Sequence, residues 1–145
     1  MNHAWADWPM PNHPGSQLPN EQKYALIGGV DGETVRDEIT NLTWQRRAPD
    51  QRLTWQAARD YCAALSLGGW NDWRLPSRVE LVSILDLSRT NPSINLEAFP
   101  DSRGEWYWTA SPQADDSERA WVVYFYFGYP DTDPKENEYP ARCVR

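Results

Sequence analysis

Residues 68–77 read GGWNDWRLPS and place two tryptophans, Trp70 and Trp73, in a short polar turn. Bulky rings in such a turn have two explanations. Either the turn is a folded corner whose rings are pinned into a core, or it is a platform on which a ligand rests. The segments on both sides of the turn set the frame of the fold, because each of them has the pattern of a helix.

Before the turn, apolar residues recur at three- and four-residue spacing, which predicts an amphipathic helix of about a dozen residues. Thr54 is a good N-cap, and Gly68-Gly69 provides a glycine stop. After the turn, Ser77 and Glu80 match a capping box that opens a second helix to about Leu87. The apolar positions of the two helices are Trp55, Ala58, Tyr61, Cys62 and Leu65, then Val79, Leu81, Val82, Ile84 and Leu85.

The remaining regular segments have the composition of short strands. In RAWVVYFYFG at 119–128, alternate residues are apolar on both faces, which is typical of a central strand buried on two sides. A hairpin is expected within 33–46, with its turn near Thr40-Asn41. The other predicted strands are YALIGGV at 24–30, EWYWTAS at 105–111 and PARCVR at 140–145. A long irregular segment at 88–104, a polar loop at 112–118 and an acidic loop at 129–139 complete the pattern.

Length and charge limit the architecture and the partners. A chain of 145 residues suits one domain, here residues 23–145, preceded by a Pro- and Asn-rich arm at 1–22. In this arm, Trp5 and Trp8 could lie along the domain or a neighbour. A net charge of -7 argues against sequence-independent nucleic-acid binding and against anionic membranes. No apolar run reaches the length of a membrane span, so we expect no membrane insertion.

Histidine and cysteine usage limits the chemistry. Both histidines, His3 and His13, lie in the arm, which argues against Ser-His-Asp and Cys-His catalysis and against histidine-rich zinc sites. We therefore expect no enzyme activity. Cys62 and Cys143 lie far apart and form no CxxC motif, so they are either one disulfide or two buried thiols. A disulfide would stabilise the fold by roughly 4 to 5 kcal/mol and would point to an exported protein.

Two acidic clusters are candidates for a calcium site. Hard cations take six to eight oxygen ligands, and acidic irregular loops can supply them. The spacing matches no EF-hand, and the alternative is solvated charge that keeps the domain soluble. Apart from calcium we expect no cofactor. The clusters comprise Asp115, Asp116 and Glu118, and then Asp131, Asp133, Glu136 and Glu138.

Four aromatic residues near these loops, Trp106, Trp108, Tyr129 and Tyr139, could stack on a sugar ring. The alternative for each ring is packing in the core. An acidic rim beside exposed aromatic rings suits a neutral or cationic ligand better than a sulfated one.

Six blocks of this sequence resemble the bacterial DUF1566 family, which is the C-terminal domain of the Legionella collagen-like adhesin (Lcl) and its relatives. The blocks span about residues 33–145 in the order LTWQRR, TWQAARDYCAAL, GGWNDWRLPSRVEL, WYWTAS, AWVVYFYFG and ARCVR. This family is similar to the superfold of C-type lectins and formylglycine-generating enzymes. The resemblance implies a C-type-lectin-like α+β fold: two helices packed on small, twisted, mainly antiparallel sheets with long irregular loops.

The resemblance also implies roles for particular residues. Cys62 and Cys143 would form the disulfide that staples the domain. The GGWNDWRLPS turn would be a structural connection between helices. Trp70 and Trp73 would then pack into the core, and Asp72 or Arg74 would bond the turn backbone or form a buried ion pair.

The implied function is a non-catalytic adhesion module, extracellular or in the cell envelope, that recognises a glycan or a surface protein through sheet-borne loops. An exported form would carry its signal peptide outside this sequence, because Met1 begins no charged-then-apolar pattern. One alternative is a structural domain that forms a homo-oligomer such as a trimer, with Tyr124, Tyr126 or the arm at the interface. Another is a formylglycine-generating type of oxidase, which would need two active-site cysteines close together on a metal.

Overall fold

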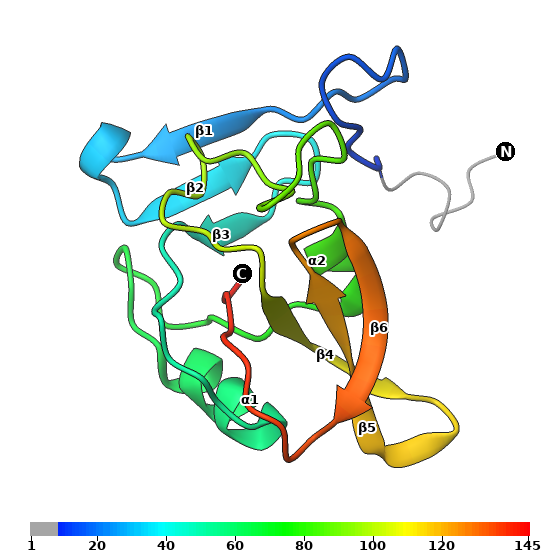
Figure 1. The fold of residues 1–145 in the computed structure, drawn as a ribbon. Helices are drawn as coiled ribbons and strands as arrows, with labels where there is room; N and C mark the ends of the chain where they lie inside the picture. Colours follow the sequence, from blue (N-terminus) through cyan, green and yellow to red (C-terminus); the bar gives the residue numbers. More distant parts are fainter. Residues whose placement is uncertain (1–8) are drawn as a thin grey trace, which may run out of the picture.

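The computed structural model describes residues 9–145 and has an α+β fold, as predicted. Two small antiparallel sheets lie at an angle to one another, with two short α-helices packed beside the second sheet (Figure 1). The roles considered for Trp5 and Trp8 fall outside the described residues. The resemblance to C-type lectins stays a prediction. No helix within residues 9–145 is long and apolar enough to cross a membrane.

The first sheet contains the predicted hairpin. Its strands run in the order β1-β2-β3, and a 3₁₀ turn, η1, follows β1. At the hairpin turn Asn41 takes a left-handed φ of 63°, and Asp37 Oδ1 accepts hydrogen bonds from the backbone N–H groups of Ile39 and Thr40. Asparagine and aspartate are favoured at such positions for these two reasons. The bounds are β1 (Tyr24–Ile27), η1 (Gly29–Asp31), β2 (Thr34–Asp37) and β3 (Thr43–Gln45).

The C-terminal segment lies between this sheet and the GGWNDWRLPS corner (Figure 1). Thr43 and Arg145 exchange backbone hydrogen bonds of 2.8 and 2.9 Å, and Val144 exchanges two of 2.9 Å with Arg74. The buried Arg142 guanidinium donates to the carbonyls of Gln45 and Arg46 at 2.8 and 2.7 Å. The segment predicted to close the chain as a strand is therefore not a full strand. It is an extended segment joined to β3 and to the corner by isolated β-bridges.

The second sheet has the order β4-β5-β6, with β5 in the centre. The prediction of a strand buried on two sides is confirmed, because the neighbours Val122 and Val123 face opposite sides and are 2 % and 0 % exposed. β5 ends before Phe127, which lies in the following turn and is 60 % exposed. The bounds are β4 (Trp106–Gln113), β5 (Asp116–Tyr124) and β6 (Tyr129–Pro134).

Two segments of this sheet were predicted to be loops, and both predictions are wrong. The segment 112–118 is a tight hairpin that turns at 114–115, and the acidic segment 129–139 begins with strand β6. The sequence does not predict β6, because the side chains of this edge strand are largely in contact with solvent and need not be apolar. Its prolines, Pro130 and Pro134, and its carboxylates disfavour pairing with another chain at the open edge.

Helix α1 (Trp55–Ala64) begins as predicted, because the Thr54 hydroxyl accepts a hydrogen bond from Ala57 N–H at 3.4 Å. The helix is 10 residues long and ends at Ala64, with Leu65 as its C-cap, before the expected glycine stop. Gly68 and Gly69 instead form the next turn, where both take positive φ angles of 61° and 84°.

Helix α2 (Arg78–Val82) opens with the predicted capping box between Ser77 and Glu80. At 5 residues it is shorter than expected, since the chain then tightens into turns in which Leu85 N–H bonds the Val82 carbonyl at 3.1 Å. The Ser83 hydroxyl bonds the Glu80 carbonyl at 2.5 Å, and this bond accompanies the tightening. The apolar residues that predicted a longer helix remain buried: Ile84 is 0 % exposed.

Two hydrophobic clusters cover the two faces of the second sheet. One joins Val123 and Phe125 to α2 and to the first sheet. The other packs Trp108 and Val122 beneath α1. Cys62 of α1 and Cys143 are bonded in this second cluster, and neither is exposed. The disulfide implied by the family resemblance is therefore present, and it links the helix to the C-terminal segment.

The corner at 68–77 packs only one of its two tryptophans. Trp73 is 3 % exposed, as expected, and its indole N–H lies 3.2 Å from two turn carbonyls. The expectation for Trp70 is wrong: it is 48 % exposed, and the guanidinium of Arg145 lies 3.7 Å above its ring. Arg145 also pairs with Asp72, so the ion pair of this corner is at the surface rather than buried.

Arg74 forms the second ion pair of the corner. Its two terminal nitrogens bond the two carboxylate oxygens of Glu80 at 2.6 and 2.7 Å. Because Glu80 also closes the capping box, this bidentate contact ties the corner to the start of α2. The corner is thus a folded connection, and its exposed indole is covered on one side by an arginine.

Removing the disulfide should cost much of the stability. The bond spans 81 residues, and in the chain-entropy treatment such a loop contributes roughly 4 to 5 kcal/mol. We expect the double variant Cys62→Ala/Cys143→Ala to lose about that much free energy of unfolding in urea titrations. Reductant should not change the free energy of unfolding of this variant, whereas it should lower that of the native chain to the value of the variant. A loss below about 1 kcal/mol would contradict this view of the bond.

Glu80 should make stability depend on acid pH. Burial alone would raise the pKa of Glu80, but hydrogen bonds from Arg74 and from Ser77 N–H outweigh it and lower the pKa below 4.5. A lowered carboxyl pKa contributes stability above the unfolded pKa, and this stability is lost as pH falls through the folded pKa. Glu80→Gln should therefore cost roughly 1 kcal/mol at neutral pH and progressively less below about pH 4.5.

Urea titrations between neutral pH and about pH 3 would measure this effect. Glu97→Gln is the matched control, because Glu97 is exposed and forms no ion pair within residues 9–145. An equal cost of Glu80→Gln at both ends of the pH range would show that the carboxylate charge does not matter.

Candidate functional site

The four aromatic residues considered as ligand contacts lie in two places. Trp106 and Tyr129 belong to a surface group where β4 begins, near the β5–β6 turn. Trp108 has no exposed surface, and its indole N–H donates to the Leu53 carbonyl at 2.8 Å in the core. Tyr139 is half-buried and meets the Trp108 ring edge-on at 5.3 Å. The surface group is the place where aromatic rings are available to a ligand.

Strand register assembles this surface group. Trp106, Tyr124 and Tyr129 are direct neighbours across β4, β5 and β6, so their side chains stand on one face of the sheet. The rings of Trp106 and Tyr124 stack with centroids 4.3 Å apart, and Tyr129 meets them edge-on at 5.7 and 5.5 Å. The turn adds Tyr126, stacked on Tyr124 at 6.0 Å, and Phe127. We call these five residues the aromatic cluster.

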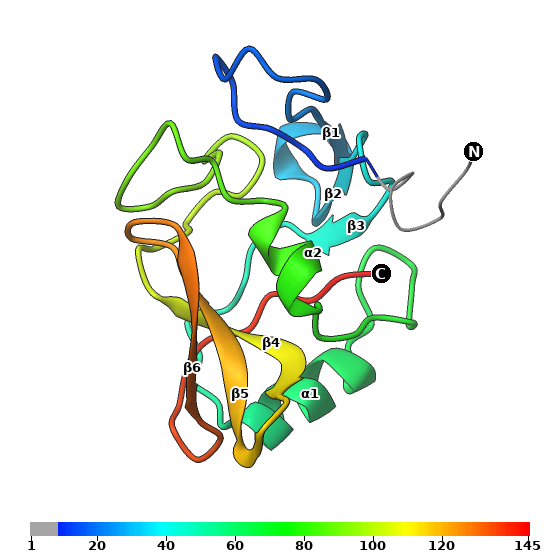
Figure 2. The same ribbon diagram turned by 90° about the vertical axis from the view of Figure 1, so that its right-hand side faces the viewer.

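The aromatic cluster lies where no helix covers the sheet. In Figures 1 and 2 the β5–β6 turn is at the end of the sheet opposite to α1 and to the β4–β5 hairpin. Phe127 is 60 % exposed and Tyr129 is 44 % exposed, while the other three rings are half-buried. Contiguous exposed apolar surface of this kind commonly marks an interaction site.

The aromatic cluster presents apolar rings, and three of these rings carry a polar hydroxyl group. Its three tyrosine hydroxyls, on Tyr124, Tyr126 and Tyr129, can each donate one hydrogen bond and accept others. The charged residue next to Trp106 in the chain, Glu105, is paired with Arg52 at 2.9 Å, so this pair adds no net charge. Such a surface suits a ligand with apolar faces, many hydroxyls and no charge.

The seven acidic residues lie along the β-ribbons and in the turn after β6. Within residues 9–145, no three Asp, Glu, His or Cys side chains are grouped so that they could hold a metal ion. Several of these carboxylates instead accept local hydrogen bonds. Asp116 bonds Glu118 N–H at 3.0 Å, and Asp131 bonds Thr132 N–H at 2.7 Å.

Asp133 has the most developed environment of the seven. One of its carboxylate oxygens accepts from Asn137 Nδ2 at 2.7 Å and from the Tyr139 hydroxyl. Burial, followed by this bond to Asp133, raises the pKa of Tyr139 to about 12. Asp133 therefore fastens the turn after β6 to the sheet. Glu136 and Glu138 are exposed in that turn.

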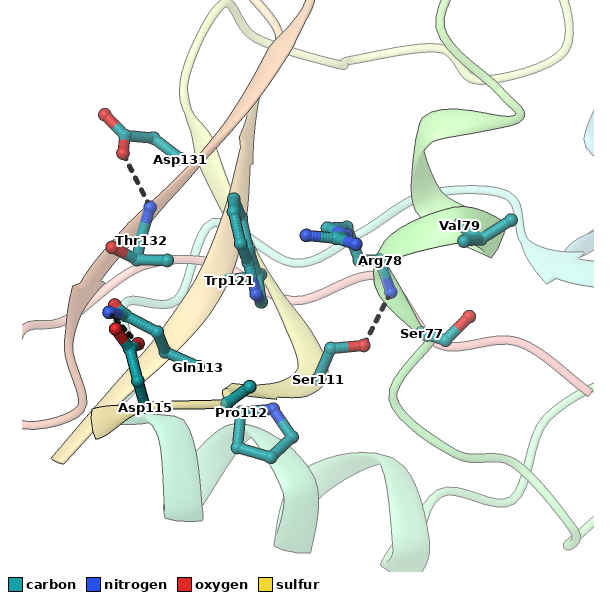
Figure 3. A pocket seen from close by; sticks show the side chains of 11 residues that line it. Ser77, Arg78, Val79, Ser111, Pro112, Gln113, Asp115, Trp121, Asp131 and Thr132 are labelled. Carbon is teal, nitrogen blue, oxygen red and sulfur yellow. Dashed lines mark hydrogen bonds between the residues drawn. The ribbon is translucent and has the colours of Figure 1, made fainter. Parts of the chain in front are cut away.

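A groove that the sequence patterns did not predict lies between α2 and the β4–β5 hairpin (Figure 3). It has a volume of about 480 Å³. Asp115 and Asp131 line it, together with Trp121 and Arg78, whose guanidinium lies 4.1 Å above the Trp121 ring. The alternation of apolar residues along 119–128 predicts that Trp121 packs in the core. The sequence of α2 gives no sign that Arg78 lines a groove. The groove depends on the packing of α2 against the sheet, which no local pattern reports.

Comparison with known proteins places the chain in a family. No curated protein matches it at a significant level. The family model of the Lcl C-terminal domain matches residues 33–145, which include both helices, the whole second sheet and both cysteines. The matched range also contains the aromatic cluster and the groove. The chain therefore belongs to the Lcl C-terminal domain family.

Proposed function

We propose that this chain is a non-catalytic recognition domain that binds an uncharged glycan on the aromatic cluster. The observation that carries the proposal is the cross-strand row of Trp106, Tyr124 and Tyr129, extended by two rings of the turn. Sugars present an apolar C–H face and a hydroxyl edge. Exposed rings suit the first, and tyrosine hydroxyls suit the second.

Charge favours an uncharged glycan over a sulfated one. The chain has a net charge of -7, so a polyanion would approach against the overall field. The aromatic cluster itself consists of Trp, Tyr and Phe side chains and contains no acidic or basic residue. Affinity would come from ring contacts and hydrogen bonds, and should therefore respond little to salt.

The proposed location is the cell surface or the extracellular space. The Cys62–Cys143 disulfide is compatible with this location, since the cytosol keeps thiols reduced. The disulfide also bears on the oxidase alternative. A formylglycine-generating type of site needs a pair of thiols, and both cysteines of this chain are bonded to each other.

A second candidate function uses the same surface to bind another copy of the chain. Tyr, Trp and Phe are enriched in protein interfaces, and Tyr124 and Tyr126, the residues considered for an oligomer contact, both lie in the aromatic cluster. An oligomer such as a trimer would cover these rings, whereas a monomer would leave them open to a glycan. The two functions therefore predict different masses in solution.

Binding to immobilised neutral and sulfated glycans, followed by calorimetry on the best ligand, tests the proposal. We expect a neutral glycan to bind, and expect Phe127→Ala and Tyr129→Ala each to weaken it roughly five- to tenfold, about 1 kcal/mol per lost ring contact. Trp70→Phe is the control, because Trp70 is an exposed indole outside the aromatic cluster.

Sedimentation of the same variants separates the alternatives. A native oligomer that Tyr129→Ala converts to a monomer would favour the second candidate. A glycan that binds all variants equally, or a preference for sulfated glycans that salt abolishes, would refute the aromatic cluster as the site.

The acidic residues give a separate prediction about calcium. Because the four aspartates accept local hydrogen bonds and the acidic side chains of residues 9–145 are not grouped, we expect millimolar calcium to change the midpoint of thermal unfolding by less than about 1 °C. The midpoint should be equally unaffected by EDTA. A rise of several degrees that Asp131→Asn/Asp133→Asn abolishes would instead establish a calcium site at β6.

A further inference from the structure

The groove beside α2 is a second surface with its own chemistry, at the other end of the sheet from the aromatic cluster. Its volume of about 480 Å³ falls within the range of small-ligand pockets, roughly 300 to 1,000 Å³. One wall is the first turn of α2 with Ser77 and Arg78, and the other is the β4–β5 hairpin with Ser111 and Gln113. Trp121 stands between the two walls (Figure 3).

The positive wall of the groove is a single, fixed guanidinium. The Arg78 guanidinium carbon lies 4.1 Å from the centroid of the Trp121 ring, and this cation–π contact restrains the charged group beside the indole. Within residues 9–145 Arg78 has no ion-pair partner, although most arginines near the surface of this acidic chain have one. A guanidinium in such a contact can still donate N–H hydrogen bonds to a carboxylate.

The negative wall lies across Trp121 from Arg78. Figure 3 shows Asp115 on the hairpin side of the indole. Asp115 Oδ1 accepts from Gln113 Nε2 at 2.7 Å, so its second oxygen can serve a ligand. Asp131 lies at the rim of the groove, and because it pairs with Val122 across β5 and β6 its side chain stands on the other face of the sheet from Trp121.

Gln113 adds an acceptor to this wall. Its Nε2 donates to Asp115, which fixes the orientation of the amide and leaves Oε1 as the acceptor. Oε1 is buried and has no hydrogen-bond partner among the described residues. A buried acceptor without a partner carries a desolvation cost that a donor from a ligand would relieve.

From this separation of charge we propose that the groove binds a zwitterionic ligand, namely an amino acid or short peptide. Its carboxylate pairs with Arg78, its ammonium group faces Asp115, and its apolar body lies against Trp121. A purely anionic ligand would meet the Asp115 carboxylate, and a purely cationic one would meet Arg78. The inference is independent of glycan binding, because it uses no residue of the aromatic cluster.

Three dipeptide probes of similar size separate the two charges. Alanyl-leucine carries both charges, N-acetyl-alanyl-leucine carries only the carboxylate, and alanyl-leucinamide carries only the ammonium group. Each is titrated into the ¹⁵N-labelled 145-residue chain, and chemical-shift changes of the Arg78 amide and the Trp121 indole N–H report binding. We expect alanyl-leucine to bind at least about tenfold more tightly than either single-charge probe, because each charged hydrogen bond lost has roughly that effect.

Variants assign the two ends of the ligand. Arg78→Gln should weaken alanyl-leucine about tenfold and leave alanyl-leucinamide unweakened. Asp115→Asn should weaken alanyl-leucine similarly and leave the acetylated probe unweakened. Arg59→Gln is the matched control, because Arg59 also lies over an indole, that of Trp55, outside the groove.

Several outcomes would overturn the inference. The absence of saturable shifts at these two residues would do so, as would equal affinity for all three probes. Tighter binding of a single-charge probe would instead show a simple anion or cation site. Backbone spectra of each variant verify folding, so a loss of binding in a well-dispersed spectrum is attributable to the removed charge.

Discussion

The last five residues of the chain hold the rest of the structure together. Cys143 is bonded to α1, and Val144 bridges both β3 and the corner at Arg74. Arg142 is buried against β3 carbonyls, and Arg145 pairs with Asp72 while covering Trp70. These contacts join segments that are far apart in sequence. The C-terminal segment therefore connects the first sheet, the corner and α1 to one another.

The packing of the second sheet determines which parts of it reach solvent. Because β5 is packed on both faces, one against α2 and the first sheet and the other against α1, the middle of the sheet is closed to solvent. Surface chemistry is left to its two ends. The β5–β6 turn carries neutral aromatic rings, and the β4–β5 hairpin meets α2 in a groove with separated charges. A rigid sheet can therefore present two different surfaces without a moving part.

Local patterns predicted the parts of the fold whose physics is local. The caps at Thr54 and Ser77 and the hairpin turn at Asn41 depend on side chains bonding backbone a few residues away, and all three are confirmed. Patterns failed where packing prevailed. β6 looked like a loop because an edge strand tolerates polar residues, and α2 is short because its apolar residues continue into the core through tighter turns.

The sequence by itself determined the helix starts and the central strand and, through family resemblance, the α+β class, the disulfide and the family. Tertiary structure decided the rest. Trp70 stays at the surface, where Arg145, distant in the chain, covers one face of its ring, and Trp108 is buried while Trp106 reaches the surface. The rings of the aromatic cluster meet through strand register, and Arg78 meets Trp121 only when α2 packs on the sheet. Contacts between distant segments depend on the whole fold, which no short window of sequence contains.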